Sequence, residues 1–171
     1  MSDPATQPKF LPYEERCEVE DFILTEARYA DESRYDDWES LLEDDMIYWV
    51  PRGVGDFDPN RDISIINDNR SRVATRIRQL KTGTRHSQTP VSPMSRIISN
   101  IVITRLSDSE YKVNANFVLH EIAVQSTETM NIMPGRVEYH IRRRENGFGM
   151  FYKKITLING ASAVPTIAYL I

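Results

Sequence analysis

The chain has few of the residues that most metal and cofactor sites require. Its 171 residues include one cysteine, Cys17, and three histidines, His86, His120 and His140. One thiol cannot form a disulfide within the chain, a cysteine-rich zinc site or an iron–sulfur centre. The seven glycines are not spaced as GxGxxG or as a Walker-type phosphate loop. The composition therefore indicates a domain with little material for holding a cofactor.

Long apolar runs are also missing. The first ten residues are polar and contain two prolines, so they lack the apolar stretch of a secretory signal peptide. Elsewhere the uninterrupted apolar runs span only a few residues, far fewer than the roughly 20 that cross a bilayer. We therefore expect a soluble, cytosolic protein that makes no membrane contact.

Charge is distributed unevenly, although the formal net charge is only −4. Residues 1–60 carry 17 acids and 5 bases, a balance of −12, whereas residues 61–171 carry 8 acids and 16 bases, a balance of +8. A basic second half is a feature of many proteins that bind nucleic acid. However, no aromatic residues interleave with the basic residues of 70–81 and 142–144. We therefore expect these bases to pair with the acidic half or with a partner subunit, and expect no nucleic-acid binding.

The first half of the chain has helical periodicity. Three prolines in residues 1–12 predict an N-terminal arm, followed by a single domain over residues 13–171. Apolar residues at helical spacing predict a helix over 14–30, and Ser33 is expected to cap a second helix over 34–42. A third helix is expected to run from a cap at Asn67, Asp68 or Asn69 to about Lys81.

The remaining segments are expected to be strands. β-Branched and aromatic residues predict short strands over 46–50 and 63–66, and period-2 alternation predicts long strands over 97–106, 111–125, 133–144 and 148–158. Asn146-Gly147 is a strong signal for a hairpin between the last two strands. In the third long strand, Val137, Tyr139 and Ile141 should share one face, opposite Arg136, Glu138, His140 and Arg142.

Helices at the start followed by long strands predict an α+β fold. Strands of ten or more residues exceed the usual length, so the sheet has to curl strongly. We expect a strongly curved mixed or antiparallel sheet that forms a half-open cone, with the first helix lying across its mouth.

Six segments, taken in order, resemble the small (β) subunits of Rieske-type aromatic-ring-hydroxylating dioxygenases. The longest is the helix-to-strand passage EARYADESRYDDWESLLEDDMIYWVP at residues 26–51. The others, all shorter, are residues 67–70 (NDNR), 80–83 (LKTG), 96–101 (RIISNI), 135–136 (GR) and 153–155 (KKI). The resemblance covers roughly residues 13–171.

This resemblance implies a nuclear-transport-factor-like, or scytalone-dehydratase-like, cone. It also implies a bacterial cytoplasmic protein that acts as the structural subunit of a terminal oxygenase. In that family the large (α) subunit carries the Rieske [2Fe-2S] cluster and the mononuclear Fe(II), commonly in an α3β3 hexamer. We accordingly expect no cofactor, metal or catalytic residue on this chain. The complex would convert an aromatic compound to a cis-dihydrodiol with O₂ and electrons from NAD(P)H.

Two other interpretations use residues of the chain itself. His120 and His140 are on neighbouring expected strands and could, with Glu121 or Glu138, hold a metal, although a solvated or interface position suits His140 better. Cone folds also include isomerases and lyases that use Asp, Tyr and His for proton abstraction. The candidates for such a set are Tyr29, Tyr48, Asp68, His120 and Tyr139. A third alternative is a stand-alone module that binds a small apolar ligand in the cone.

If the chain is an assembly subunit, its contacts should lie at a strand end, a loop, a basic sheet face and the apolar tail. A chain that ends in TIAYLI should have this tail buried, either within the fold or between subunits. The candidate interface residues are Trp49, Arg52, Arg85, Arg96, Arg136, Arg142, Arg144 and Tyr169. Partners would be the α subunit and further copies of this chain arranged as a trimer.

Overall fold

The computed structural model describes residues 11–53, 55, 58, 61–82, 91–123, 128–160, 167 and 169–171. Two helices come first along the chain and strands dominate the second half, as an α+β fold requires. In chain order the elements are α1 (Tyr13–Asp31), α2 (Tyr35–Ser40), β1 (Leu42–Pro51), β2 (Ser64–Asn69), α3 (Arg70–Lys81), β3 (Met94–Arg105), β4 (Glu110–Ala123), β5 (Thr129–Arg143) and β6 (Phe148–Leu157).

The strands form one six-stranded sheet in the order β2-β1-β6-β5-β4-β3. Strands β1 and β6 pair in parallel, and every other neighbouring pair is antiparallel. The β5–β6 hairpin turns at Gly147, whose φ of 84° lies in the left-handed region that suits glycine. The expected mixed, antiparallel-rich sheet and the Asn146-Gly147 hairpin are therefore confirmed.

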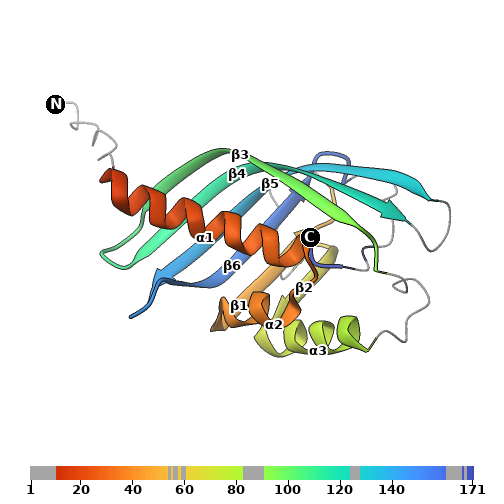
Figure 1. Ribbon diagram of the computed structural model, residues 1–171, viewed down its shortest axis with the longest axis horizontal. Coiled ribbons are helices and arrows are strands. Elements are labelled where there is room, and N and C mark those ends of the chain that lie inside the picture. The colour runs from red at the N-terminus through yellow and green to blue at the C-terminus, as the bar shows by residue number, and fades with distance from the viewer. Residues whose placement is uncertain are drawn as a thin grey trace.

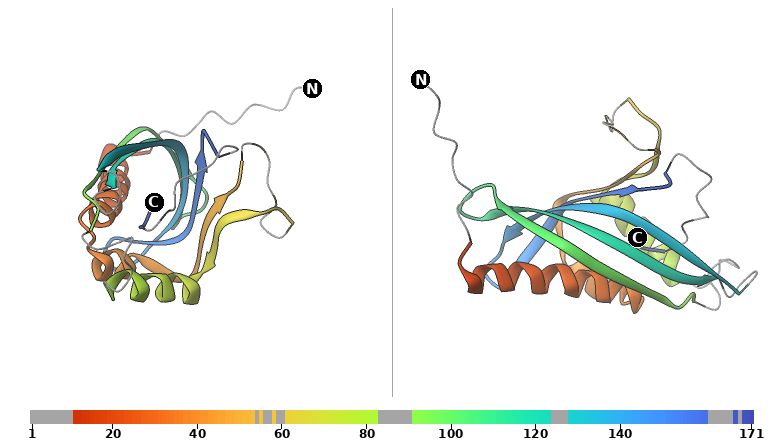
Figure 2. Two further views of the ribbon diagram at one scale, coloured as in Figure 1. Left: turned by 90° about the vertical axis from the view of Figure 1, so that its right-hand side faces the viewer. Right: turned by 90° about the horizontal axis from the view of Figure 1, so that it is seen from above.

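The sheet curls around α1 and forms a half-open cone (Figures 1 and 2). Helix α1 runs along the open side of the curl, while α2 and α3 lie together beside β1 and β2. The C-terminal end of the chain lies inside the space that the curled sheet surrounds (Figure 2). These positions confirm the expected cone with its first helix across the opening.

Polar contacts join α1 to the edge strand β3 at both ends of the helix. At one end Asp31 accepts hydrogen bonds from the backbone N–H of Arg96 at 2.8 Å and from its Nε at 2.7 Å. At the other end Glu15 accepts hydrogen bonds from Arg105 and from the Tyr111 hydroxyl on β4. The helix and the sheet edge are thereby held together, which closes the cone.

The two faces of the sheet differ because alternate side chains point to opposite sides. In β4 and β5 every second residue is buried, including Val137, Tyr139 and Ile141. Their neighbours Arg136 and His140 lie on the outer face and are exposed or half-buried. The sequence pattern therefore predicted the two faces correctly.

Several element boundaries differ from the sequence prediction because long-range pairing overrides local periodicity. Helix α2 stops at Ser40 instead of Leu42, since Leu42 is buried and pairs with Met150 of β6. Strand β1 therefore begins at Leu42 rather than at residue 46. Ser33 does not cap α2, because the N-cap position is Arg34 and Ser33 itself has a φ of 54°.

Pairing also lengthens three strands beyond their expected starts or ends. Strand β3 starts at Met94, opposite Glu121, and β5 starts at Thr129, so both follow β4 further than the alternation in their own sequences suggests. Strand β2 continues to Asn69, whose side chain caps α3 by accepting the Arg72 N–H at 3.0 Å. Of the three cap candidates, Asn69 is the one that the structure uses.

Candidate functional site

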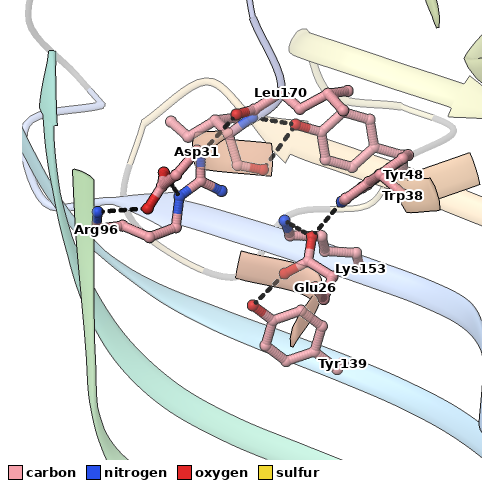
Figure 3. Close-up of polar contacts among 9 residues, drawn as sticks. Glu26, Asp31, Trp38, Tyr48, Arg96, Tyr139, Lys153 and Leu170 are labelled. Atoms are coloured by element: carbon pink, nitrogen blue, oxygen red, sulfur yellow. Dashed lines mark hydrogen bonds and ion pairs between the residues drawn. The ribbon is translucent and has the colours of Figure 1, made fainter. Parts of the chain in front are cut away.

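The most polar part of the interior is an ion pair between α1 and β6, shown in Figure 3. The Lys153 Nζ donates to Glu26 Oε1 at 2.7 Å, and Trp38 Nε1 donates to the same oxygen at 2.6 Å. The second carboxylate oxygen accepts the Tyr139 hydroxyl at 3.2 Å. Only 2% of the Lys153 side chain and none of the Glu26 side chain is exposed. Both oxygens of this buried carboxylate are thus satisfied by hydrogen-bond donors.

Regular secondary structure places both charges inside. Glu26 follows Phe22 by four residues and so lies on the buried stripe of α1. Lys153 precedes Ile155 by two residues in β6, which puts both side chains on the inner face of the sheet. The Lys153 ammonium also lies 5.6–5.9 Å from the ring centroids of Trp38, Tyr48 and Tyr139. These aromatic faces add cation–π stabilisation to the buried ammonium.

The surrounding charges determine how these groups ionise. Burial alone would raise the pKa of Glu26, but the nearby cations Lys153 and Arg96 hold that pKa below its ordinary value. Burial lowers the pKa of Lys153, against the attraction of Glu26. Burial, together with the Glu26 charge, raises the pKa of Tyr139 well above its ordinary value. Glu26 is therefore a carboxylate at neutral pH, and the Tyr139 hydroxyl keeps its proton.

A second polar group holds the C-terminal residues inside the cone (Figure 3). The Arg96 Nη2 donates to the backbone oxygen of Leu170 at 2.9 Å. The Tyr48 hydroxyl donates to the backbone oxygen of Ile171 at 2.9 Å and accepts the Ile171 N–H at 3.0 Å. Tyr169, Leu170 and Ile171 are all buried. Burial of the apolar tail, which the sequence predicted, is therefore confirmed for its last three residues, and it occurs within the subunit; Thr166 and Ala168 lie outside the described residues.

The space between these groups, as the described residues line it, is small. A cavity lined by Arg96, Tyr139, Lys153 and Ile171, among others, has a volume of about 10 Å³, enough for about one water molecule. A substrate would have to displace the tail or break the ion pair, both of which stabilise the fold. The arrangement therefore acts as a structural brace between the helices, the sheet and the tail.

The structure brings together only part of the acid–base set that the sequence suggested. Tyr48 and Tyr139 both lie in the interior around Lys153. Asp68 instead binds Arg76 at 2.6 Å beside α3, and the Tyr29 ring lies under the Arg34 guanidinium at 4.3 Å. His120 is opposite Ile132 on the outer face of the sheet. The five candidates are thus divided among separate parts of the molecule.

The two strand histidines do not meet. His120 pairs across the sheet with Ile132, whereas His140 pairs with Lys112, eight positions away along β4. His140 Nε2 lies 3.0 Å from Glu138 Oε1, and its ring packs against Tyr152 at 4.8 Å between centroids. Within the described ranges, no three His, Cys, Asp or Glu residues are grouped so that they could hold a metal ion. His86 lies outside these ranges.

Sequence reasoning missed Glu26 and Lys153 as partners. A signal for each was present: Glu26 is an acid on the apolar stripe of a helix, and Lys153 is a base at an inward position of a strand. A charge at such a position is rarely buried unless it is paired. Neither signal identifies the partner, which is 127 residues away in the chain.

Comparison with protein families identifies the chain. Residues 25–162 match the model described as "Ring hydroxylating beta subunit", which covers most of the sequence. The chain belongs to this beta-subunit family. The resemblance seen in the six sequence segments is therefore correct, and beta subunits of this kind are components of oxidoreductase complexes.

Relatives of this beta subunit agree with the assignment. The small oxygenase component of the p-cumate 2,3-dioxygenase system of Pseudomonas putida is 28% identical, over 90% of this chain and 84% of its own length. The beta subunit of benzoate 1,2-dioxygenase from Burkholderia mallei ATCC 23344 has a TM-score of 0.73 at 21% identity, covering 95% of this chain and 99% of that one.

The cone fold itself is shared more widely. A scytalone dehydratase-type protein from Novosphingobium aromaticivorans DSM 12444 matches with a TM-score of 0.64 and 14% identity, covering 84% of each chain. At this identity the likeness shows the fold alone. It confirms the expected scytalone-dehydratase-like cone.

The structure distributes the candidate interface residues of this beta subunit over three environments. Trp49 and Tyr169 are buried, and only 4% of the Arg96 side chain is exposed: Trp49 donates to Ser64 Oγ at 2.8 Å, and the other two lie in the cone. Arg142 and Arg144 are half-buried and form ion pairs with acids of their own chain.

Two further candidates are exposed, namely Arg52 and Arg136. Arg85 lies outside the described residues. Arg52 and Arg136 are thus the described candidates most accessible to another subunit, and the interface itself stays a prediction. Over the part of the chain that is described, no helix is long and apolar enough to span a membrane.

Proposed function

We propose that this chain is the assembly subunit of the terminal oxygenase of a bacterial, cytoplasmic aromatic-ring-hydroxylating dioxygenase and contributes no reacting group. The family match over residues 25–162 carries this proposal. The cone interior supports it, because the Glu26–Lys153 pair and the C-terminal residues fill the place where a cone-shaped enzyme would bind substrate.

The complex would join both atoms of O₂ to an aromatic ring and give a cis-dihydrodiol. NAD(P)H supplies the two electrons and, with one solvent proton, the two hydrogens that balance the product, and it leaves as NAD(P)⁺. A Rieske cluster needs two cysteines and two histidines, and this chain has a single cysteine. The chain therefore does not fit that cluster, and we assign the Rieske cluster and the mononuclear Fe(II) to the large subunit.

The contribution of this chain would be geometric. In an α3β3 arrangement, electrons pass between neighbouring large subunits, so the relative positions of those subunits have to be fixed. A curled sheet braced by buried ion pairs and by the α1–β3 contacts is a stiff support for this purpose. Exposed Arg52 and Arg136 are the described residues that we expect to contribute most to subunit contacts.

Co-expression with a Rieske-containing large subunit tests the proposal. We expect one hexamer-sized species in which all iron belongs to the large subunit, as metal analysis of the separated chains would show. A purified chain that stays separate from such a subunit and turns over a ketone or hydroxy-ketone by itself would contradict the proposal. That result would favour the alternative of an acid–base lyase or isomerase.

A further inference from the structure

The outer face of the sheet is hollowed between β3 and β6. The hollow has a volume of about 220 Å³. Its side chains come from two adjacent cross-strand rows, Asn116–Arg136–Thr156 and Asn114–Glu138–Lys154. Asn100 adds a sixth donor side chain from β3, where the register with β4 shifts and the backbone has a φ of 52°. Polar groups from four strands thus converge on one place.

Most of these polar groups lack a side-chain partner within the described part of the chain. Among the described residues, the side chains of Asn100, Asn114, Asn116, Arg136 and Thr156 make no hydrogen bond or ion pair. The Lys154 ammonium lies over the Trp49 ring, 4.5 Å from its centroid. Glu138 differs from these groups, because it binds Lys112 and His140 of the next row on the same face. The hollow therefore contains hydrogen-bond donors that have no acceptor among the described residues.

The charge of the hollow indicates which acceptor would fit. Arg136 and Lys154 supply two positive charges. Glu138 is the acid in the hollow, and it is already bound to Lys112 at 2.8 Å and to His140 at 3.0 Å. Two cations that bind no acid among the described residues, together with amide and hydroxyl donors, suit a carboxylate, which accepts several hydrogen bonds and can bind a guanidinium with both oxygens.

An exposed apolar strip borders the hollow. The next row across the sheet consists of Ile97, Val118 and Pro134, and it continues to Ile158, whose N–H donates to the Pro134 carbonyl. Ile97 is 59% exposed and Ile158 65% exposed, and Ile132 in the following row is 55% exposed. Large apolar side chains grouped next to a charged hollow are typical of a protein-binding surface rather than of a site for a free small ion.

The outer surface of α1 carries two exposed acids. Glu14 and Asp21 are exposed there and have no ion-pair partner among the described residues. The exposed side chain of Leu24 follows Asp21 by three residues, which places the two about 5–6 Å apart on the helix surface. In the sheet, Arg136 and Pro134 are two residues apart, or about 6.6 Å. The distance between the charged side chain and the apolar side chain is therefore similar on the two surfaces.

We propose that the hollow is a carboxylate-binding site and that it receives Asp21 on α1 of a second copy of this chain. The apolar strip would pack against Leu24 of that copy. Because each copy carries both the hollow and the acidic helix, the contact is head-to-tail, and such contacts close into a ring when the rotation permits. This proposal rests on the proposed assembly function and names one interface within it.

Charge reversal of the full-length chain tests the contact. We expect Arg136→Glu to raise the dissociation constant for self-association by roughly tenfold or more, as measured by sedimentation equilibrium. The combined variant Arg136→Glu/Asp21→Arg should restore association, because the pair is reversed at every interface of the ring. Arg78→Glu, on the exposed side of α3, removes the same charge elsewhere and should change nothing.

Each alternative outcome overturns the proposal. A monomeric wild-type chain, an Arg136→Glu variant that associates normally, or a double variant that folds but stays dissociated would each do so. Circular dichroism establishes that the variants fold. Co-purification with the large subunit, measured for the same variants, distinguishes a failure of the carboxylate site from a failure of the proposed assembly function. If the wild type co-purifies but Arg136→Glu does not alter self-association, only the carboxylate site fails; if the wild type never co-purifies, the proposed function fails.

Discussion

The inside of the cone and the hollow on its outer face handle polar groups in opposite ways. Inside, the carboxylate of Glu26 receives three donors, and the backbone of Ile171 is bound through both its N–H and its oxygen. In the outer hollow, Arg136 and Asn116 have no side-chain partner among the described residues. Polar groups that folding removes from water are paired within the chain, since an unpaired buried group is costly. Unpaired donors persist where water, or another subunit, can supply the acceptor.

Breaking the inner pair should have the largest effect. Glu26→Ala leaves the Lys153 ammonium buried without its carboxylate, so we expect a loss of about 3–5 kcal/mol in the free energy of unfolding. Urea unfolding followed by tryptophan fluorescence, at one fixed protein concentration, measures it. The double variant Glu26→Leu/Lys153→Met removes both charges and should recover most of the loss. A loss below about 1 kcal/mol for Glu26→Ala would mean that the inner pair is no stronger than a surface pair.

Acid should weaken the same pair. Lys153 and Arg96 together outweigh burial and hold the pKa of Glu26 below its ordinary value of 4.5. The unfolded chain therefore takes up the proton first, so this part of the stability is complete above about pH 4.5 and is lost as the pH falls below it. One such group contributes a slope of up to about 1.4 kcal/mol per pH unit.

Unfolding measured between pH 3 and 6 checks this effect. The slope should be smaller in the double variant Glu26→Leu/Lys153→Met, which lacks the titrating carboxylate. Glu138, whose pKa is also lowered despite partial burial, because Lys112 and His140 bind it, keeps its own contribution in both proteins. Equal slopes in the wild type and the double variant would show that Glu26 does not titrate in this range.

Tyrosine variants on the inner and the outer face of the sheet allow a direct comparison of the two faces. Tyr48→Phe removes the hydroxyl that binds Ile171 and leaves buried backbone groups unpaired, so we expect a loss of about 1–3 kcal/mol. Tyr152→Phe removes a hydroxyl from the outer face that has no hydrogen-bond partner among the described residues, and it should change stability by less than about 0.5 kcal/mol. Thermal unfolding of the two variants measures the difference. Equal losses would remove the distinction between the faces.

The smallest effect on stability is expected in the hollow itself. Asn116→Ala and Thr156→Ala remove side chains with no partner in the described chain, so unfolding should change by less than about 0.5 kcal/mol. Self-association should still weaken by a few-fold, because each loses one donor to the incoming carboxylate. Variants that lower stability while leaving association unchanged would reverse the comparison between the two regions.

Local sequence signals predicted much of the fold. The helix expected over 14–30 agrees with α1 to within one residue at each end, and the Asn146-Gly147 turn lies where it was expected. Both depend on residues close in the chain: apolar spacing in the helix and a glycine that tolerates positive φ in the turn. The boundaries that failed, at α2 and at the starts of β1, β3 and β5, are those that pairing with a distant strand determines.

The candidate site was predicted less well. The sequence correctly indicated a buried tail, and it placed Tyr48 and Tyr139 among the interior candidates. It could not assemble Glu26 with Lys153, because that contact depends on how tightly the sheet curls around α1. Nor could it separate Arg136, which is exposed and unpaired among the described residues, from Arg96, whose side chain is 4% exposed and bound to Asp31.

By itself the sequence determined the α+β class, the inner and outer faces of the long strands, and membership of the beta-subunit family. These properties depend on periodicity and on short ordered segments, which a linear chain displays directly. Only the tertiary structure decided which charges pair in the interior and which donors remain free on the outer face. The physical reason is that pairing depends on distances of a few ångströms between residues far apart in the chain, and the curl and register of the sheet set those distances.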